Sequence, residues 1–350
     1  MRKLSLYILL FFTAMVCSPV IEASSVPGNT AISDLEEDPE VNCETIAGGK
    51  SETIAVTKAA AYEAVMSEIA LKEHLKALTD SLSLGRGSGT SGASHAREYI
   101  TERYQEYGLE PLGIGGYSHN FKVKDLNCAN IVGLVSSTER SEKYVVIGAH
   151  YDHLGIIKGI VYPGADDNAS GVAALLELAK AFAMYKQDGN PLPVNLIFVA
   201  FDAHEQSLAG SRNFFTTTRI KPYTIDFMVN IDQIGSVLSP VHPGLKNYLL
   251  VLGQDKFQDW IWENIELSNK LHGINLDLDY SFYGSEQFYK LFYRLSEQAD
   301  FVVRAVPSAF FTSGVTQLTN KPSDTEANIN YEALRKRLSL IYYFIYNQIL

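Results

Sequence analysis

Histidine and carboxylate side chains stand directly after apolar runs that we predict to be β-strands. His150 ends the run YVVIGAH, Glu205 follows VNLIFVAFDAH, and Asp232 ends FMVNID. Asp166 and Asp167 lie in the loop PGADDNASG, which opens a helix. Imidazole nitrogens and carboxylate oxygens together are typical zinc ligands. One such residue is more often a cap or a buried polar group, but four groups at equivalent positions favour a metal site.

The elements that position these side chains alternate between strand and helix along the chain. Continuous apolar strands separated by helices predict an α/β protein, with a mostly parallel central sheet and helices on both faces. In such a sheet, functional groups gather beyond the carboxyl ends of the strands. We expect strands at residues 129–135, 144–149, 194–201, 227–231, 248–252 and 308–311, and helices at about 93–107, 208–215, 257–271 and 331–347 and after Asn168.

The amino-terminal segment has the pattern of a secretory signal peptide. Arg2 and Lys3 precede an apolar run from Leu4 to Val16, and the small residue Ala23 offers a cleavage point. The run is short for a membrane span of about 20 residues, although a retained anchor stays open as the alternative. We therefore expect an exported chain, periplasmic or secreted, with a signal peptide, a flexible lead-in and one α/β domain at residues 1–23, 24–52 and 53–350.

Composition narrows the classes of function. The hydrophobic content of 46% is enough for a large core, and the net charge of −11 argues against nucleic acid as a partner. Cys43 and Cys128 stand outside any CxxC pair, which excludes a thiolate zinc site, and whether they form a disulfide stays open. Cys17 lies in a poor match to a lipidation box. No stretch after the leader is apolar enough to span a membrane.

Five stretches of the sequence, in order, resemble the co-catalytic zinc aminopeptidases of metallopeptidase family 28. This class contains bacterial leucyl aminopeptidases and the related carboxypeptidase and transferrin-receptor ectodomains. The resemblance covers roughly Ala60 to Leu350 and implies a zinc-aminopeptidase-like three-layer sandwich. Its stretches are HYDHLG, PGADDNASG, FDAHEQSLAGSRNF, NIDQIG and KPSDT.

The resemblance implies a complete ligand set for one zinc ion. His150 matches the histidine of one zinc, and Asp232 matches the terminal carboxylate on the same ion. Asp166 corresponds to the aspartate whose two oxygens bridge the metals, and the Asp166–Asp167 peptide is expected to be cis, as is typical of the family. Asp152 resembles the carboxylate that orients the His150 ring and raises its basicity.

The second zinc site departs from the family pattern. Glu205 matches its glutamate, but Asn320 stands where the family has a late histidine, and an amide is a weak zinc ligand. Residues 288–350 contain no histidine at all. His204 occupies the position of the glutamate that acts as general base, a task that histidine can also perform. The resemblance thus implies zinc as cofactor, two ions in the family, with one retained and the second site weakened here.

Two functions stay open on this sequence. The first is an exported aminopeptidase that acts on peptides or amino-acid derivatives, with His204 handling the proton. The second is a pseudo-peptidase that binds peptides or a protein partner without turnover, which the changes at positions 204 and 320 favour. Water or a nearby residue such as His242 or His272 could replace the missing ligand. Cyclisation of the glutaminyl cyclase kind fits less well, because those enzymes need the late histidine.

Overall fold

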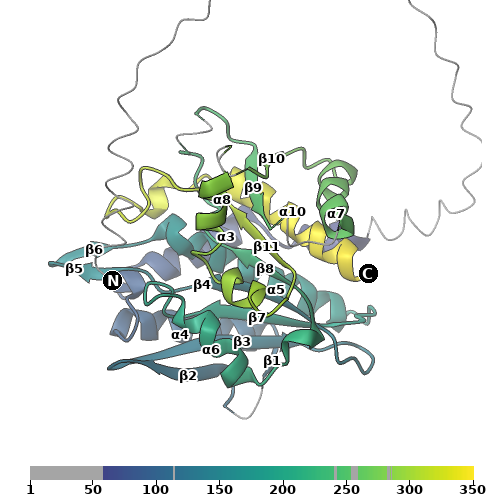
Figure 1. Cartoon of the computed structure of the whole chain (residues 1–350), viewed down its shortest axis with the longest axis horizontal. Helices are drawn as coiled ribbons and strands as arrows, with labels where there is room; N and C mark the ends of the chain where they lie inside the picture. Colours follow the sequence, from purple (N-terminus) through teal and green to yellow (C-terminus); the bar gives the residue numbers. More distant parts are fainter. Residues whose placement is uncertain (1–57, 113–114, 240–242, 254–258, 282–283, 285) are drawn as a thin grey trace, which may run out of the picture. The chain divides into compact units, whose positions relative to one another are not determined.

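A nine-stranded mixed sheet runs through the part of the chain that the structure describes (Figure 1). The computed structural model describes residues 58–112, 115–239, 243–253, 259–281, 284 and 286–350. The strand order is β1-β3-β7-β4-β8-β11-β9-β10, with β2 beside β3. The strands are β1 (Glu110–Pro111), β2 (Ser118–Val123), β3 (Leu126–Val135), β4 (Tyr144–His150), β7 (Asn195–Phe201), β8 (Ile225–Ile231), β9 (Tyr248–Leu252), β10 (Asp277–Asp279) and β11 (Ser308–Thr312), and a separate ribbon joins β5 (Gly155–Ile157) to β6 (Ile160–Tyr162).

The centre of the sheet is parallel and its flanks are antiparallel. Strands β7, β4, β8 and β11 run in one direction, whereas β3 opposes β7 and β9 opposes β11. The segment 136–143, which joins β3 to β4, is too short for the crossover that parallel strands require, so these two strands must run in opposite directions. The prediction of an α/β fold with a central sheet and flanking helices is confirmed.

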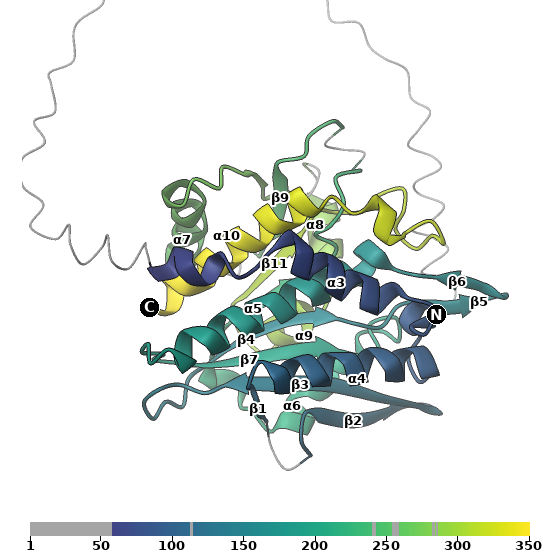
Figure 2. The same cartoon turned by 180° about the vertical axis from the view of Figure 1, so that it is seen from behind.

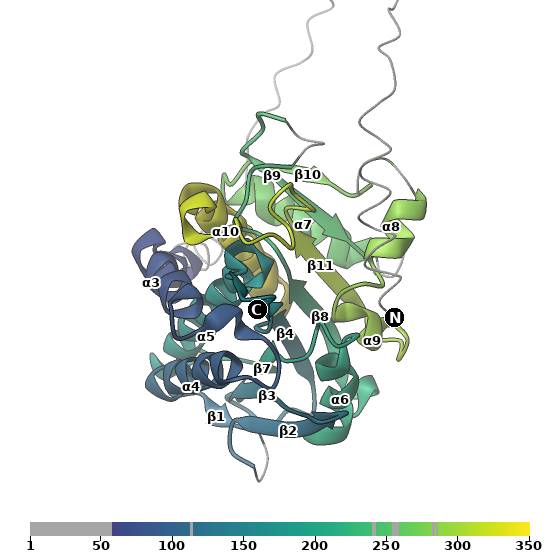
Figure 3. The ribbon, with the colours of Figure 1, turned by 90° about the vertical axis from the view of Figure 1, so that its left-hand side faces the viewer.

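Helices cover both faces of the sheet (Figures 2 and 3). Figure 2 shows α3, α4, α5 and α10 in front of the strands, and Figure 3 shows α6 and α9 on the opposite side. Among the described residues, no helix has both the length and the apolar character needed to cross a membrane. The helices are α3 (Glu68–Thr79), α4 (Ser91–Glu106), α5 (Ser170–Gln187), α6 (Ala209–Thr218), α7 (Asp259–Leu271), α8 (Glu286–Phe292), α9 (Gln298–Val302) and α10 (Tyr331–Ile349).

The central strands bury side chains on both faces. In β4, Val145 and Ile147 pack into the core under α5, and Val146 packs into the opposite core with Phe214 and Phe301. Because alternate side chains point to opposite faces, a strand covered on both sides must be apolar throughout. This is why the central strands read as continuous apolar runs. Burying each large side chain stabilises the fold by roughly 1.5–3 kcal/mol.

All described elements belong to one compact unit, Gly49–Leu350. The predicted leader and lead-in lie outside the described residues, together with Cys17 and Cys43, so export, lipidation and the disulfide stay predictions. Cys128 is buried on β3.

Candidate metal centre

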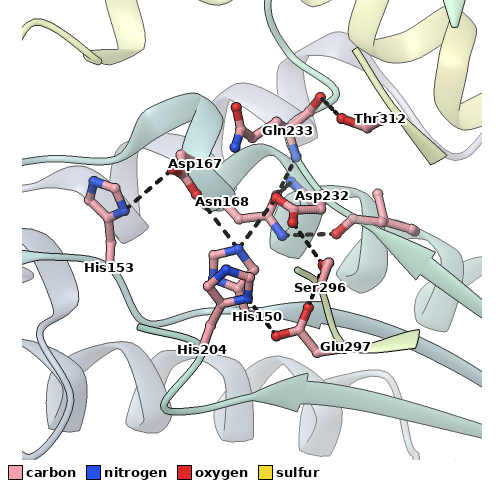
Figure 4. A network of polar contacts seen from close by, with 12 residues as sticks. His150, His153, Asp167, Asn168, His204, Asp232, Gln233, Ser296, Glu297 and Thr312 are labelled. Atoms are coloured by element: carbon pink, nitrogen blue, oxygen red, sulfur yellow. Dashed lines mark hydrogen bonds and ion pairs between the residues drawn. The ribbon is translucent and has the colours of Figure 1, made fainter. Parts of the chain in front are cut away.

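Three neighbouring parallel strands bring the predicted ligands to one edge of the sheet. His150 is the last residue of β4, and Asp232 directly follows β8. His204 and Glu205 come shortly after β7, which pairs with β4 on its other side. Because the carboxyl ends of parallel neighbours meet, residues separated by up to 82 positions come into contact. Figure 4 shows the resulting cluster.

The first group of ligands consists of His150, Asp167 and Asp232. The Nε2 atom of His150 lies 3.6 Å from Oδ1 of Asp167 and 3.3 Å from Oδ1 of Asp232. All three residues are buried. Ligand atoms around a tetrahedral zinc ion, each about 2.0–2.2 Å from the metal, lie about 3.4 Å from one another. The observed spacings match that figure.

Asp167, not Asp166, stands between the two groups of ligands. Its Oδ1 faces His150, while its Oδ2 lies 3.9 Å from Nδ1 of His153. In Asp166, Oδ1 accepts hydrogen bonds from the main-chain N–H groups of Gly235 (2.7 Å) and Ser236 (3.1 Å), Oδ2 is buried without a hydrogen-bond partner among the described residues, and no ion pair with His150 or His153 is found. The prediction that Asp166 bridges two metals is therefore wrong by one residue. Since both residues are aspartate, the sequence could not show which one faces the strand ends.

The cis peptide bond is shifted by one residue as well. It joins Asp167 to Asn168, so the prediction of a cis Asp166–Asp167 bond is wrong. The surrounding turn is fixed by Asp324, whose two oxygens accept the main-chain N–H groups of Asp166 (2.9 Å) and Asp167 (3.0 Å). Asn168 in turn donates to the carbonyl of Ile231 at 2.8 Å, at the end of β8. These bonds hold Asp167 beside Asp232.

The second group of ligands consists of His153, Asp167 and Glu205. The Nδ1 atom of His153 lies 3.7 Å from Oε1 of Glu205, and one ligand atom from each of the three residues lies within 4.8 Å of the others. Burial and the nearby Arg86 charge hold the pKa of His153 well below its usual value, which favours the neutral imidazole. His153 was not predicted as a ligand, although it belongs to the stretch HYDHLG.

Asp152 acts differently from the prediction. The Nδ1 atom of His150 bonds the main-chain carbonyl of Asp152 at 3.0 Å, whereas the carboxylate is 4.0 Å away. That carboxylate instead accepts the main-chain N–H groups of His204 (3.0 Å) and Glu205 (3.2 Å) and the hydroxyl of Ser88 (3.0 Å). Asp152 therefore orients the His150 ring through its backbone, and its side chain holds the loop that carries His204 and Glu205.

His204 pairs with a buried carboxylate that the sequence did not reveal. Its Nδ1 lies 2.7 Å from Oε1 of Glu297, just before α9. Burial would raise the pKa of Glu297, but the charge and hydrogen bond of His204 lower it to about 2. The hydroxyl of Ser296 lies 2.8 Å from Glu297 and 2.9 Å from Asp232, so the pair is joined to the metal ligands. A single glutamate outside any motif gave no signal in the sequence.

The ring of His204 stacks on that of His150, although one ligand atom from each of His150, His204 and Asp232 lies within 4.8 Å of the others. The two ring centroids are 3.8 Å apart and the ring planes differ by 17°. The lone pair of an imidazole nitrogen lies in the plane of the ring. Two nearly parallel, stacked planes do not meet at an ion about 2.1 Å from each ring. In this arrangement only one of the two rings can direct a nitrogen at a given ion, and the contacts of His150 with Asp167 and Asp232 favour His150 as the candidate ligand.

The remaining histidine and amide candidates do not join the centre. Asn320 is exposed, with a φ of 59°, and among the described residues no hydrogen bond links it to a ligand. His272 stacks on Tyr343 at 3.5 Å and lies 3.3 Å from the Asn347 amide, so it is not the replacement ligand. His242 lies outside the described residues.

The residues present fit zinc. Both groups described above offer imidazole nitrogen and carboxylate oxygen, and both ring nitrogens of His153 lack a hydrogen-bond partner among the described residues. Burial raises the pKa of Asp167 well above its usual range; His150 opposes this rise, and Asp232 and Glu205 add to it. Carboxylates crowded in a buried site need a cation to balance them.

Comparison with known proteins identifies the family of this chain. Residues 130–345 match the model of Peptidase family M28. The chain belongs to this family. A relative named "Probable zinc metalloprotease" from Pyrenophora tritici-repentis is 32% identical over 159 residues, which cover 41% of this chain and 35% of the relative. The chain spans about a third of the length of the zinc metalloproteases that it matches.

Solved structures share the fold of this M28 chain. The LapA aminopeptidase of Legionella pneumophila superposes with a TM-score of 0.64 at 19% identity, covering 88% of this chain and 78% of LapA. The glutaminyl cyclase of Porphyromonas gingivalis superposes with a TM-score of 0.63 at 14% identity, covering 81% of this chain and 99% of the cyclase. Since enzymes of two different names share this fold, the fold alone does not fix the reaction.

Proposed function

We propose that this chain is an exported, zinc-dependent hydrolase that removes residues from the amino termini of peptides. The observation that carries the proposal is the position of Asp167, whose two oxygens face two different imidazoles at the ends of parallel strands. Family membership supports a zinc peptidase, and the apolar leader from Leu4 to Val16 supports export.

The first group of ligands suits a catalytic zinc ion. His150, Asp167 and Asp232 provide three protein ligands, and a catalytic zinc site keeps a further position for water or substrate. Zinc, when bound there, supplies Lewis-acid polarisation of the scissile carbonyl and makes water more acidic. The carbonyl of Asp152 fixes the proton of His150 on Nδ1, so that the lone pair of Nε2 would be available to a zinc ion.

His204 is the group that we expect to move the proton. Its Nδ1 is engaged by Glu297, which leaves Nε2 to exchange a proton with water or with the leaving amine. Its side chain is 18% exposed, whereas that of Glu297 is 1% exposed, so the histidine is the accessible member of the pair. A buried carboxylate that holds the ring and stabilises its charged form performs the same task in hydrolytic triads.

The carboxylates of the centre bear on the proposed substrate class. Asp167, Asp232, Glu205 and Glu297 place four carboxylates around the centre. Of these, Glu205 has the most exposed side chain, at 26%. Asp167, Asp232 and Glu205 would be neutralised by bound zinc, and Glu297 pairs with His204, so these oxygens do not by themselves select an ammonium group. The proposal of peptide amino termini is supported by membership of Peptidase family M28 and by the fold shared with the LapA aminopeptidase.

Binding without turnover is the second candidate. It is favoured by the charged pair at His204, because Glu297 and Asp232 raise the pKa of His204 well above its usual value against the effect of burial. An imidazole that is already protonated cannot accept a proton from water. Under this reading, the centre would hold a peptide amino terminus or a protein partner and release it unchanged.

Hydrolysis assays separate the two candidates. We would load the mature protein with zinc and measure release from a panel of aminoacyl p-nitroanilides, with mass spectrometry of a mixed peptide library as a second readout. His204→Ala should lower kcat about 10²–10⁴-fold with unchanged zinc content. His95→Ala, a histidine on α4 paired with Asp80, is the matched control and should keep wild-type activity. No release by the zinc-loaded wild type, with tight peptide binding by calorimetry, would refute hydrolysis and favour binding.

A further inference from the structure

His153 is a fully enclosed imidazole whose polar atoms are unused. The residue is 1% exposed, and among the described residues neither Nδ1 nor Nε2 has a hydrogen-bond partner. A buried polar atom without a partner costs about 1–3 kcal/mol, so such atoms are rare in folded proteins. An imidazole with two unpartnered nitrogens therefore requires an explanation.

The nearest charged atoms lie at metal-ligand spacing and not at hydrogen-bond spacing. Nδ1 of His153 is 3.7 Å from Oε1 of Glu205 and 3.9 Å from Oδ2 of Asp167. Both distances exceed a hydrogen bond, which for N–H···O ends near 3.2 Å. They are close to the roughly 3.4 Å that separates two ligands of one tetrahedral zinc ion.

The ring of His153 is held in place by its surroundings. Its main-chain N–H donates to the carbonyl of Arg86 at 3.3 Å, and its backbone pairs with Gly87 as an isolated β-bridge. A Cβ atom on Gly164 would lie 2.5 Å from Cδ2 of the ring, so only glycine lets the loop before Asp167 pack this closely. The ring is thus fixed beside the carboxylate of Asp167.

We propose that His153, Asp167 and Glu205 bind a second metal ion, with His153 in place of the late histidine that is missing at position 320. The proposal deepens the proposed function, since it concerns the same centre. Asp167 then bridges the two ions, with Oδ1 on the side of His150 and Oδ2 on the side of His153. Under this proposal the chain has two complete zinc sites, where the sequence implied one retained zinc and a weakened second site.

Metal stoichiometry tests this assignment independently of activity. We would titrate the metal-free mature protein with Zn²⁺, follow binding by calorimetry, and count tightly bound zinc by elemental analysis. The wild type should bind two ions, and His153→Gln should keep one ion and bind the second at least about 100-fold more weakly. Fewer than two ions on the wild type, or two tightly bound ions on His153→Gln, would overturn the proposal.

Two further variants test whether His153, and not Asn320, is the third ligand of the second metal ion. Asn320→Ala should keep both ions, and loss of one ion in this variant would overturn the proposal in favour of Asn320. His119→Gln is the matched control, because His119 is also buried and its Nε2 also lacks a partner among the described residues. This control should bind two ions, and loss of an ion there would show that the titration reports folding and not coordination.

Anomalous diffraction on the wild type covers the case in which His153→Gln does not fold. Two zinc peaks are expected, one of them about 2.1 Å from a ring nitrogen of His153. A second peak away from His153, or an ordered water bridging the ring to Glu205 with a single zinc peak, would overturn the proposal. Two ions bound as proposed on a protein that hydrolyses nothing would refute the proposed function and leave this site standing.

Discussion

The buried guanidinium of Arg86 should be a main support of the metal centre. It is completely buried and donates four hydrogen bonds, to the carbonyls of Leu78 (2.7 Å), Tyr151 (2.7 Å), Pro163 (2.6 Å) and Gly164 (2.7 Å). These carbonyls belong to the end of α3, the residue after His150, and the loop before Asp167. One side chain therefore ties together three segments that carry or flank the ligands.

The variant Arg86→Lys measures this support. Burial lowers the pKa of Arg86 to about 10, against the opposing charges of Asp324, Asp167 and Asp152, so the side chain is charged at pH 7. A lysine has a single nitrogen and cannot reproduce the planar fork, so we expect at least two of the four bonds to be lost. At about 1.5–3 kcal/mol for each bond to a charged group, the loss is about 3–6 kcal/mol. That is a large part of the 5–15 kcal/mol typical of a whole domain.

Urea unfolding followed by circular dichroism is the assay. The midpoint for Arg86→Lys should fall by about 1 M urea or more. Arg140→Lys, at an exposed position, should stay within about 0.5 kcal/mol of the wild type. If Arg86→Lys were also within 0.5 kcal/mol, the four bonds would not support the centre and this reasoning would be refuted.

Three other predictions concern the leader, the buried cysteine and the proton-handling pair. Expression with the intact leader should yield an exported chain that begins at Ser24, and mass spectrometry of an uncleaved, membrane-bound chain would contradict this. Burial raises the pKa of Cys128 to about 12, with Asp202 and Asp152 adding to the effect, so iodoacetamide at pH 8 should label its thiol only after unfolding in urea. Rapid labelling of the native protein would be the contrary result. Glu297→Gln should lower kcat with little change in KM or zinc content, and an unchanged kcat would exclude the pair from catalysis.

The sequence predicted the central strands and the meeting of His150, Glu205 and Asp232 at one edge of the sheet, because both leave strong local patterns. His150, Glu205 and Asp232 stand directly after apolar runs, and parallel neighbours carry such residues to one edge. The central strands are apolar throughout because both faces are covered. The hairpin strand β2, by contrast, has alternating burial at the edge of the sheet. Because it contains polar residues, it does not form a continuous apolar run and was not predicted.

The sequence predictions failed where the direction of a side chain, or a contact with a distant segment, decides which residues meet at the centre. Asp166 and Asp167 are chemically identical, and only the turn held by Asp324 shows that the second one faces His150. The role of His153 depends on Gly164 packing against its ring, and that contact spans an irregular loop. Glu297 reaches His204 from a distant segment through a contact that no spacing rule describes.

Zinc binding by two single-residue variants tests the central claim, that Asp167 joins two metal sites. Asp167→Asn and Asp166→Asn remove one oxygen charge at adjacent positions of the same buried turn, so each controls for the other. Elemental analysis after dialysis against zinc-free buffer should find both ions lost or strongly weakened in Asp167→Asn. Asp166→Asn should retain both ions, because its carboxylate bonds Gly235 and Ser236 instead. Two zinc ions on Asp167→Asn, with loss of zinc from Asp166→Asn, would contradict the account.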